Sequence, residues 1–396
     1  MILRAEGELL LCCARVRGDA ETADRIRALL KEPIDWARLL RMARDHGVGP
    51  LLYCHLDTNA AEAVPVEVLG QLRDEFRANT RRNLLLTGEL LCLLEGFRSA
   101  SIPVVPFKGP TLASALYGSL GLREFTDLDL LIRPGDLGAS KRLLLAHGYR
   151  PGIDLTGAQE EALLKHQYEL PFVRSTDGTI VELQWRIVPR YFSLTLDFAR
   201  FEPRLGSASL LGRPVLSLSP EDLLLVLCVH GTKHLWQRLG WVCDVGELLR
   251  VHVDLDWDNV LDTARRMGAE RILLLGATLA RSLLQAPVPE VISARIDADP
   301  ALTALEQTVS SRMFGRPERP VGLVAQSWFH LKTRERLMDR VRYCMGLTLA
   351  TTPGDWATVS LSDPLFAFYY PMRFLRLAVK YGVGVHRGPR PSDDGL

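Results

Sequence analysis

The spacing of apolar residues changes along the chain and divides it into four parts. Residues 1–100 and 216–350 place apolar residues three or four positions apart, as amphipathic helices do. Residues 101–215 contain short β-branched runs bounded by glycine and proline, which are typical of strands. Residues 351–396 predict a terminal helix and a flexible tail rich in proline, glycine and serine. We therefore predict an α+β fold, with a small mixed β-sheet core flanked by N- and C-terminal helical regions.

Both helical parts contain recognisable helix boundaries. The longest N-terminal helix is predicted from about residue 66 to residue 100, with a break near Asn79 or Asn83. In the C-terminal part, Ser219 is placed as an N-cap before Pro220 and two acidic residues, which predicts the start of a helix.

The middle part alternates strand and helix signals. The hairpin signal is a pair of β-rich runs joined by Ser175-Thr176-Asp177-Gly178. The elements expected here are a strand at 102–107, a short helix at 111–117, a strand at 126–132, a helix at 134–147 and a hairpin at 169–187.

Composition excludes several broad classes of protein. The 396 residues carry 48 Lys and Arg against 47 Asp and Glu, so the net charge is only +1. This balance argues against a protein that coats nucleic acid and against a highly charged disordered chain. The seven cysteines include no C-x-x-C pair, so neither a disulfide framework nor a zinc ribbon is predicted.

The sequence predicts a cytoplasmic protein. No apolar run approaches the 18 residues of a membrane span, and the first residues lack the organisation of a signal peptide. Unpaired cysteines suit a reducing compartment. The aromatic stretch 366–371, followed by Arg373, Arg376 and Lys380, fits either a membrane surface or a terminal helix packed on the core.

Two acidic residues on one predicted strand suggest chemistry. Asp127 and Asp129 are separated by one residue, so both carboxylates project from the same face of strand 126–132. They repel each other unless a cation lies between them, and hard oxygen ligands suit Mg²⁺ or Mn²⁺. By itself, a D-x-D pair fits a solvated strand end equally well.

Two neighbouring segments favour a site for a phosphorylated ligand. Lys108 and Gly109 end one strand and open a short helix, which brings backbone amides and an ammonium to a place suited to phosphate oxygens. Glu182 occupies an alternating position of strand 179–187. If that strand lies beside 126–132, Glu182 supplies a third carboxylate, and three carboxylates can hold two metal ions.

The same residues carry a resemblance to a known family. The chain resembles the uncharacterised nucleotidyltransferase family, which is similar to the polymerase-beta-type nucleotidyltransferase superfamily, with Lys-Gly where most relatives have Gly-Ser. We place the resemblance over about residues 5–345. The motifs that carry it are Phe107-Lys108-Gly109, Ala115-Leu116-Tyr117, Gly121-Leu122-Arg123, Thr126-Asp127-Leu128-Asp129-Leu130-Leu131-Ile132, His147-Gly148-Tyr149, Val181-Glu182-Leu183-Gln184-Trp185, the segment His230–Trp236 and the segment Leu239–Asp244.

The resemblance implies roles for individual residues. It implies a nucleotidyltransferase core in which Asp127, Asp129 and Glu182 act in catalysis and bind metal. It also implies phosphate contacts at Lys108 and Gly109, and it directs Arg123 toward the triphosphate. Gln184 stands where relatives often have histidine.

A histidine pair in the C-terminal part has three readings. His230 and His234 share a helix face, a spacing that also occurs in zinc proteases, but Gly231 replaces the glutamate that serves as the general base there. The pair could instead pack or hydrogen-bond with Trp241 and Asp244. In the third reading the pair lines a nucleotide or acceptor pocket, with Lys233 as the nucleotide-binding contact.

The leading functional hypothesis is a Mg²⁺- or Mn²⁺-dependent nucleotidyltransferase that uses a nucleoside triphosphate. An acceptor hydroxyl would attack the α-phosphorus and release pyrophosphate. A small molecule, a peptide or a protein is favoured as the acceptor over a long RNA because net positive charge is lacking. One alternative is a D-x-D glycosyltransferase, which predicts a larger α/β domain before the motif. Another is a non-catalytic module that binds a nucleotide or a protein.

Overall fold

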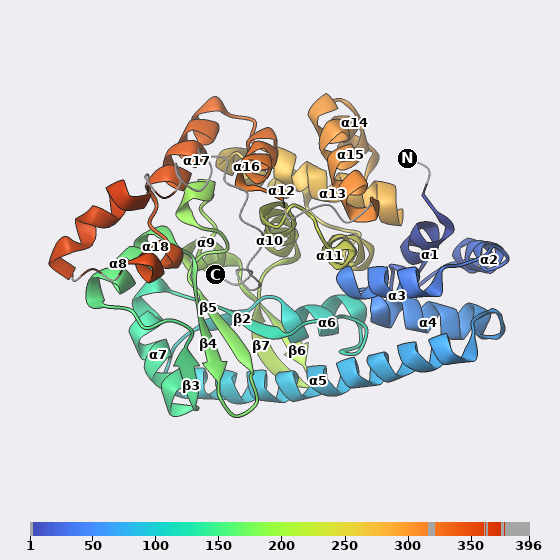
Figure 1. Ribbon diagram of the computed structural model, residues 1–396, viewed down its shortest axis with the longest axis horizontal. Helices are drawn as coiled ribbons and strands as arrows, with labels where there is room; N and C mark the ends of the chain where they lie inside the picture. The colour runs from blue at the N-terminus through green and yellow to red at the C-terminus, as the bar shows by residue number, and fades with distance from the viewer. Residues whose placement is uncertain (1–2, 316–320, 360, 362, 374–375, 377–396) are drawn as a thin grey trace.

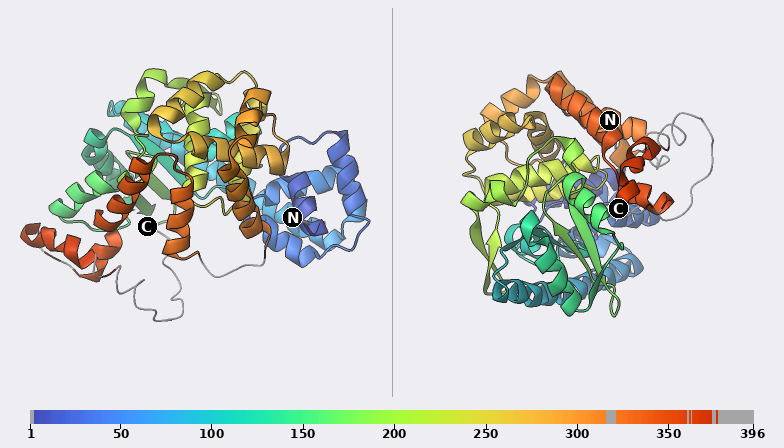
Figure 2. Two further views of the ribbon diagram at one scale, coloured as in Figure 1. Left: turned by 90° about the horizontal axis from the view of Figure 1, so that it is seen from above. Right: turned by 90° about the vertical axis from the view of Figure 1, so that its left-hand side faces the viewer.

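The computed structural model describes residues 3–315, 321–359, 361, 363–373 and 376. The flexible tail predicted at the C-terminus and Lys380 lie outside these residues. Figures 1 and 2 show the first four helices at one end of the molecule and the segment around α17 and α18 toward the other, with the main sheet between them. This arrangement confirms the predicted α+β class, in which a mixed sheet is flanked by helices on both sides in sequence.

The N-terminal part is helical, as predicted. Its last helix, α5, runs along one edge of the molecule and lies beneath both the other N-terminal helices and the sheet (Figure 1). The elements are α1 (Ala5–Cys13), α2 (Ala20–Leu29), α3 (Trp36–Asp45), α4 (Gly49–Ala60), the short 3₁₀ helix η1 (Ala61–Ala63) and α5 (Val66–Ser99).

The break predicted near Asn79 or Asn83 is wrong, because α5 is one uninterrupted helix of 34 residues. Both asparagines are buried, and their side-chain amides donate to a neighbouring loop instead of competing with the backbone of the helix. Asn79 Nδ2 donates to the carbonyl oxygen of Gly121 at 2.9 Å, and Asn83 Nδ2 donates to that of Leu120 at 2.6 Å. These asparagines therefore fasten α5 to the loop that leads into the central strand.

The main sheet has five strands in the order β1-β2-β5-β4-β3. Strands β2 and β5 pair in parallel at its centre, and the other neighbours pair antiparallel. Each expected strand of the middle part is present within a few residues. The strands are β1 (Val104–Pro106), β2 (Asp127–Ile132), β3 (Tyr149–Pro151), β4 (Glu169–Arg174) and β5 (Ile180–Gln184), and a separate two-stranded sheet contains β6 (Gly206–Leu210) and β7 (Arg213–Ser217).

Short helices connect the strands of this middle part. Those after β1 and β2 were expected from the sequence, and the second begins with a 3₁₀ turn at Pro134–Asp136. The helices are α6 (Gly109–Tyr117), α7 (Leu137–Ala146), α8 (Gly157–His166) and α9 (Phe198–Phe201), with 3₁₀ helices η2 (Pro134–Asp136), η3 (Arg190–Phe192) and η4 (Glu202–Arg204).

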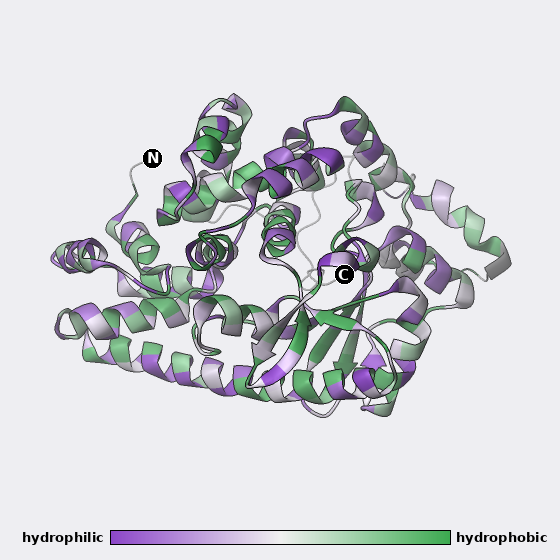
Figure 3. Ribbon diagram, turned by 180° about the vertical axis from the view of Figure 1, so that it is seen from behind, coloured by the Kyte–Doolittle hydropathy of each residue, from purple (hydrophilic) through white to green (hydrophobic). Residues whose placement is uncertain are grey.

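The two faces of the main sheet differ in character. On one face, Leu128 and Leu130 of β2 and Leu183 of β5 are almost fully buried, in a cluster with apolar residues of α5 and α7. On the opposite face the same strands carry acidic side chains. Figure 3 shows the strands as mostly hydrophobic, whereas the long α5 helix has mixed colours. The apolar face fixes the orientation of the strands and leaves the acidic face for function.

The C-terminal part packs helices over the acidic side of the sheet. Ser219 caps α10 as predicted, since its side chain accepts a hydrogen bond from the amide of Asp222. The elements are α10 (Pro220–Lys233), α11 (Leu239–Val251), α12 (Trp257–Met267), α13 (Glu270–Leu284), α14 (Glu290–Asp297), α15 (Pro300–Phe314), α16 (Leu323–Lys332), α17 (Leu337–Leu349), α18 (Pro353–Thr358) and the 3₁₀ helix η5 (Asp363–Phe368).

The aromatic stretch near the end of the chain packs on the core. Tyr369 is fully buried, and Arg373 is buried and paired with Asp355. These contacts support the packed reading of this stretch over the membrane-surface reading. Among the described residues, no helix is both long enough and apolar enough to cross a membrane.

Candidate active site

Three carboxylates lie together on the face of the sheet opposite the apolar cluster of α5 and α7. Asp127 and Asp129 project from β2, and Asp129 is the register partner of Glu182 on the parallel strand β5. Paired residues on neighbouring strands project from the same face, so the expected side-by-side placement of these strands is confirmed. The structure therefore brings Asp127, Asp129 and Glu182 to one place.

Gln184 connects two of these carboxylates. This buried side chain donates from Nε2 to Asp129 Oδ1 at 2.8 Å and to Glu182 Oε2 at 3.0 Å. An amide can make these bonds at any pH, whereas a histidine at the same position would be titratable. Gln184 thus holds the two acids at a fixed spacing through bonds that do not depend on pH.

Lys108 supplies positive charge to this group. Its Nζ donates to Asp129 Oδ1 at 2.8 Å, and the two side chains are only 12% and 2% exposed. Burial by itself lowers the pKa of Lys108, but the charges of Asp129, Asp127 and Glu182 outweigh it and raise the pKa above its usual range. The ammonium therefore feels all three carboxylates while bonding to one of them.

Gly109 shapes the turn between β1 and α6. Its φ of +54° lies in the left-handed region, and a Cβ at this position would lie 3.3 Å from the carbonyl oxygen of Asp127. Lys108 is the N-cap of α6, and its side chain makes no capping hydrogen bond. The turn brings the start of α6 close to the start of β2, beside the carboxylates.

The acidic group carries more negative charge than its lysine offsets. Burial, followed by repulsion from Asp129, raises the pKa of Asp127. Burial also raises the pKa of Glu182, and the charges of Glu169, Asp129 and Asp127 raise it further. An additional cation would relieve this repulsion.

The donor set fits a hard divalent cation, although the present spacing does not form a closed cage. In the part of the chain that the structure describes, no three His, Cys, Asp or Glu side chains are close enough to share one ion. Mg²⁺ needs no such cage, because one or two carboxylates, water and substrate phosphates usually complete its shell. Asp127 and Asp129 satisfy that requirement, with Glu182 beside them.

Histidines and a lysine at the end of α10 cover the acidic face. The rings of His230 and His234 are 4.7 Å apart between centroids, and each lies 5.3 Å from the ring of Trp241. Burial lowers the pKa of His234 to about 2, so its ring is neutral at physiological pH. The pair thus packs against Trp241, whereas His234 also lines a cavity, so the reading in which the pair lines a pocket stays a prediction. Lys233 Nζ donates to the hydroxyl of Tyr168 at 2.9 Å.

Arg123 makes a bidentate ion pair with a residue of the C-terminal helices. Its Nε and Nη2 donate to the two carboxylate oxygens of Asp244 at 2.8 Å each, and Tyr117 donates to the same carboxylate at 2.7 Å. The hydrogen bonds found for the Asp244 carboxylate within the described residues therefore go to Arg123 and Tyr117, and none goes to His230 or His234. The triphosphate contact proposed for Arg123 stays a prediction.

Sequence reasoning missed three participants: Glu169, Tyr168 and the bridging role of Gln184. Glu169 pairs in register with Gln184, so it shares the face that carries Glu182. The alternation along the expected hairpin carried this signal, because residues two apart on each strand share one face. Tyr168 lies just before β4 and carried no comparable signal.

The fold and this carboxylate-bearing face define an α+β protein of the nucleotidyltransferase type. The family model described as "Uncharacterised nucleotidyltransferase" matches residues 32–285, and the chain belongs to this family. Neither a curated protein nor a solved structure matches the chain. The family match covers every residue of the site described above.

Proposed function

We propose that the protein transfers a nucleoside monophosphate from a nucleoside triphosphate to an acceptor hydroxyl in a reaction that requires Mg²⁺ or Mn²⁺. The acceptor oxygen forms a bond to the α-phosphorus, the bond from that phosphorus to the bridging oxygen breaks, and pyrophosphate leaves. The single observation that carries the proposal is the convergence of Asp127, Asp129 and Glu182 on one sheet face beside Lys108 and Gly109.

Asp127 and Asp129 would hold the metal ion, with Glu182 as the third candidate ligand. The bound ion supplies neutralising charge to the triphosphate oxygens, and the protein contributes position and electrostatic stabilisation. Gln184 keeps Asp129 and Glu182 at a fixed spacing. Because this amide carries no charge, it leaves the carboxylates free to act as ligands.

Lys108 and Gly109 would bind the phosphates of the leaving group. The first amides of α6 have no capping partner from the Lys108 side chain, and a helix N-terminus favours an anion. On nucleotide binding, the Lys108 ammonium would move from Asp129 to a phosphate oxygen, which exposes a carboxylate oxygen for the metal. Arg123 is a further candidate contact to the nucleotide. Lys233, which the sequence also suggested as a nucleotide contact, lies instead on the β4 side of the carboxylates, where it is a candidate contact to the acceptor.

Glu182 is suited to accept the proton of the acceptor hydroxyl. Burial and the neighbouring acids raise its pKa to about 9, so in the free protein this carboxyl is protonated at neutral pH. A divalent cation bound beside it would lower this pKa and give the ionised form that can accept the proton. The proton would move from the acceptor oxygen to a Glu182 oxygen as the new bond forms. This role rests on the carboxylate lying next to Asp129.

Asp127→Asn tests the proposal most directly. Turnover of an α-labelled nucleotide, assayed with Mg²⁺ and an extract of candidate acceptors, should fall by about a hundredfold or more because a metal ligand is lost. The free energy of unfolding at pH 7 should rise by about 1–3 kcal/mol. Asp127 has a pKa of about 6 when folded and 3.8 as a free group, so its ionised form costs stability above this range.

Asp154→Asn is the matched control, because Asp154 is exposed on the same part of the chain. It should change neither turnover nor stability. Nucleotide binding by the wild-type protein without label transfer to any acceptor would contradict the enzyme and support the binding module. Consumption of nucleotide sugars in place of triphosphates would support the glycosyltransferase.

A cytoplasmic location stays a prediction from the cysteine pattern.

A further inference from the structure

A cavity of about 300 Å³ lies beside the acidic face, between β4 and the last helices of the chain. Such a volume suits a small molecule. Its walls come from β4, the loop before it, η3, the end of α10, α16 and the segment around Thr352 and Arg373. The cavity is therefore built jointly by the sheet and by helices far away in sequence.

The cavity continues the face that carries the carboxylates. Glu169 and Pro171 line it, and they are the register partners of Gln184 and Glu182 on the neighbouring strand. Because register partners share a face, the cavity opens next to Glu182. Lys233 lines the same cavity and feels the charges of Glu169 and Glu182.

The order of features across the sheet suggests what this cavity holds. The Lys108 corner follows β1, the three carboxylates lie on β2 and β5, and the cavity begins at β4. In an in-line displacement at phosphorus, the attacking and leaving oxygens lie on opposite sides of the reacting atom. With the leaving pyrophosphate at the Lys108 corner, the attacking hydroxyl has to approach from the β4 side.

The lining combines aromatic surface with positive charge. Tyr168, Tyr191 and Phe192 supply flat apolar walls, and Lys233 lies 4.1 Å from the ring centroid of Tyr168. In the described ranges of the chain, the Lys233 ammonium has no carboxylate within ion-pair distance, and its hydrogen bond goes to a neutral phenol. A half-buried ammonium of this kind favours an anionic group on the ligand.

A second cationic side chain lies behind the aromatic wall. Arg334 is fully buried between the rings of Phe192 and Tyr343, at 5.2 and 5.1 Å from their centroids. Within the described part of the chain, none of its three guanidinium nitrogens has a hydrogen-bond partner. The carboxylates of Asp339 and Glu335 offset part of its charge, and only the remainder adds positive potential on the side of Phe192.

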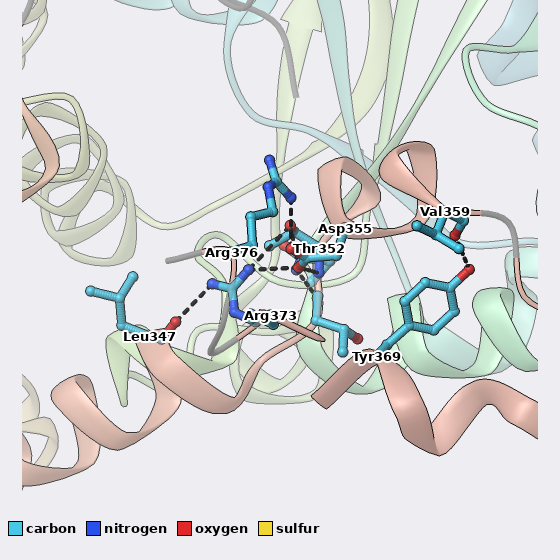
Figure 4. A network of polar contacts seen from close by, with 9 residues as sticks. Leu347, Thr352, Asp355, Val359, Tyr369, Arg373 and Arg376 are labelled. Atoms are coloured by element: carbon cyan, nitrogen blue, oxygen red, sulfur yellow. Dashed lines mark hydrogen bonds and ion pairs between the residues drawn. The ribbon is translucent and has the colours of Figure 1, made fainter. Parts of the chain in front are cut away.

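Arg373 is the third cationic side chain, and it lines the end of the cavity formed by the last helices. Figure 4 shows Arg373 held between the carbonyl oxygen of Leu347, at 2.7 Å, and Asp355, also at 2.7 Å. Asp355 additionally accepts from Arg376 at 2.6 Å, so one carboxylate serves two guanidinium groups. The network keeps Arg373 in place and leaves a surplus of positive charge at this end.

We propose that this cavity binds the acceptor, and that the acceptor is a small ring-bearing alcohol with an anionic group, such as a carboxylate or a phosphate. The ring packs on the aromatic walls, the anion lies toward Lys233 and Arg373, and the hydroxyl points to Glu182. This inference rests on the proposed nucleotidyl transfer. It narrows the favoured acceptors, which were a small molecule, a peptide or a protein, to one class of small molecule.

The test blocks the cavity from its helical wall. Gln326 on α16 lines the cavity, and Gln326→Trp would fill it without removing a charge. Gln307→Trp on α15 is the matched control, because the same change is made at an exposed position outside the cavity. Calorimetric titration of the full chain would use 2-naphthyl phosphate, its uncharged analogue 2-naphthol, and, separately, a fluorescent ATP analogue with Mg²⁺.

We expect 2-naphthyl phosphate to bind the wild type and Gln307→Trp equally, and Gln326→Trp more weakly by about tenfold or more. 2-Naphthol should bind the wild type more weakly than the phosphate by about tenfold or more, the range of one ionic hydrogen bond. The ATP analogue should bind all three proteins equally, because the leaving-group corner is on the other side of the carboxylates.

Three results would overturn the inference. The first is equal binding of 2-naphthyl phosphate to Gln326→Trp and the wild type. The second is equal binding of the phosphate and 2-naphthol. The third is a loss of ATP-analogue binding in Gln326→Trp as large as that of the naphthyl phosphate, which would make the cavity part of the nucleotide site. Failure of the ATP analogue to bind the wild type would instead overturn the nucleotidyl-transfer proposal, and with it the acceptor role.

Discussion

Lys108 and a metal ion would compete for the same carboxylate, that of Asp129. Lys108 is bonded to Asp129 and stabilised by the charges of Asp127 and Glu182. A tethered ammonium at this place lowers the repulsion among the acids before any substrate arrives. Nucleotide phosphate offers the same ammonium an alternative partner, so nucleotide and metal binding should be coupled.

Lys108→Met should therefore strengthen Mn²⁺ binding in the absence of nucleotide and weaken binding of the ATP analogue. The acids lose their internal cation, so a divalent ion replaces it at lower cost, while the phosphates lose a contact. We expect changes of about tenfold in each affinity, in opposite directions. Electron paramagnetic resonance of free Mn²⁺ measures the first and fluorescence titration the second.

Lys165→Met provides the comparison for this prediction, since Lys165 is an exposed lysine of α8. It should leave both affinities unchanged. If Lys108→Met lowered Mn²⁺ affinity along with nucleotide affinity, the idea that lysine and metal compete for Asp129 would be wrong.

At the scale of elements, the sequence predicted individual strands and helices but not the contacts between residues far apart in the chain. Strands β1, β2, β4 and β5 and helices α6 and α7 were predicted because alternation and turn residues act over a few positions, whereas β3, α8, α9, β6 and β7 were not predicted. The parallel pairing of β2 with β5 depends on a long crossover, so the sequence offered Glu182 only as a conditional third acid. The partnership of Arg123 with Asp244 spans 121 residues and left no local signal.

The break predicted in α5 is wrong because Asn83 bonds to a neighbouring loop and not to the backbone of its own helix. Asparagine competes for backbone hydrogen bonds in isolation, which predicted a break. In the fold, the Asn83 side chain is fully buried, and its amide donates to the carbonyl oxygens of Leu120 at 2.6 Å and Arg123 at 2.8 Å. The two bonds from the buried Nδ2 group override the intrinsic preference and position the loop before β2, although Asn83 Oδ1 has no hydrogen-bond partner among the described residues.

Asn83→Ala should lower the free energy of unfolding by about 2–3 kcal/mol, because it leaves two buried carbonyl oxygens without this donor and creates a cavity. Urea denaturation measures the change. Arg81→Ala, at an exposed position of the same helix, should have an effect within about 0.5 kcal/mol. A loss of the same small size for Asn83→Ala would show that α5 does not depend on this loop.

For the molecule as a whole, one apolar cluster links distant parts of the chain. Leu9 and Leu52 of the first helices belong to the same cluster as Leu225 and Leu273 of the C-terminal helices. Val105 and Leu131 of the sheet-bearing part 101–215 belong to this cluster as well, so the three parts share one core. The ion pair between Arg123 and Asp244 adds a buried polar link between the sheet-bearing part and the C-terminal helices.

Asp244→Ala should lower the free energy of unfolding by about 3–5 kcal/mol. The change leaves the guanidinium of Arg123 and the hydroxyl of Tyr117 buried without their shared partner. Asp262→Ala removes an exposed ion pair with Arg266 and should cost less than about 1 kcal/mol. Equal losses in thermal or chemical denaturation would mean that the buried pair does not join the two parts.

The alternation of β5 has a consequence for how accurately the active face is assembled. Val181 and Leu183 are completely buried on one side of this strand, and Glu182 lies between them on the other. If the strand shifted by one residue, Glu182 would point into the apolar core and Val181 would take its place beside Asp129. Because the acids repel one another, they cannot fix their own alignment, and the buried apolar face of the sheet sets the spacing between Asp129 and Glu182.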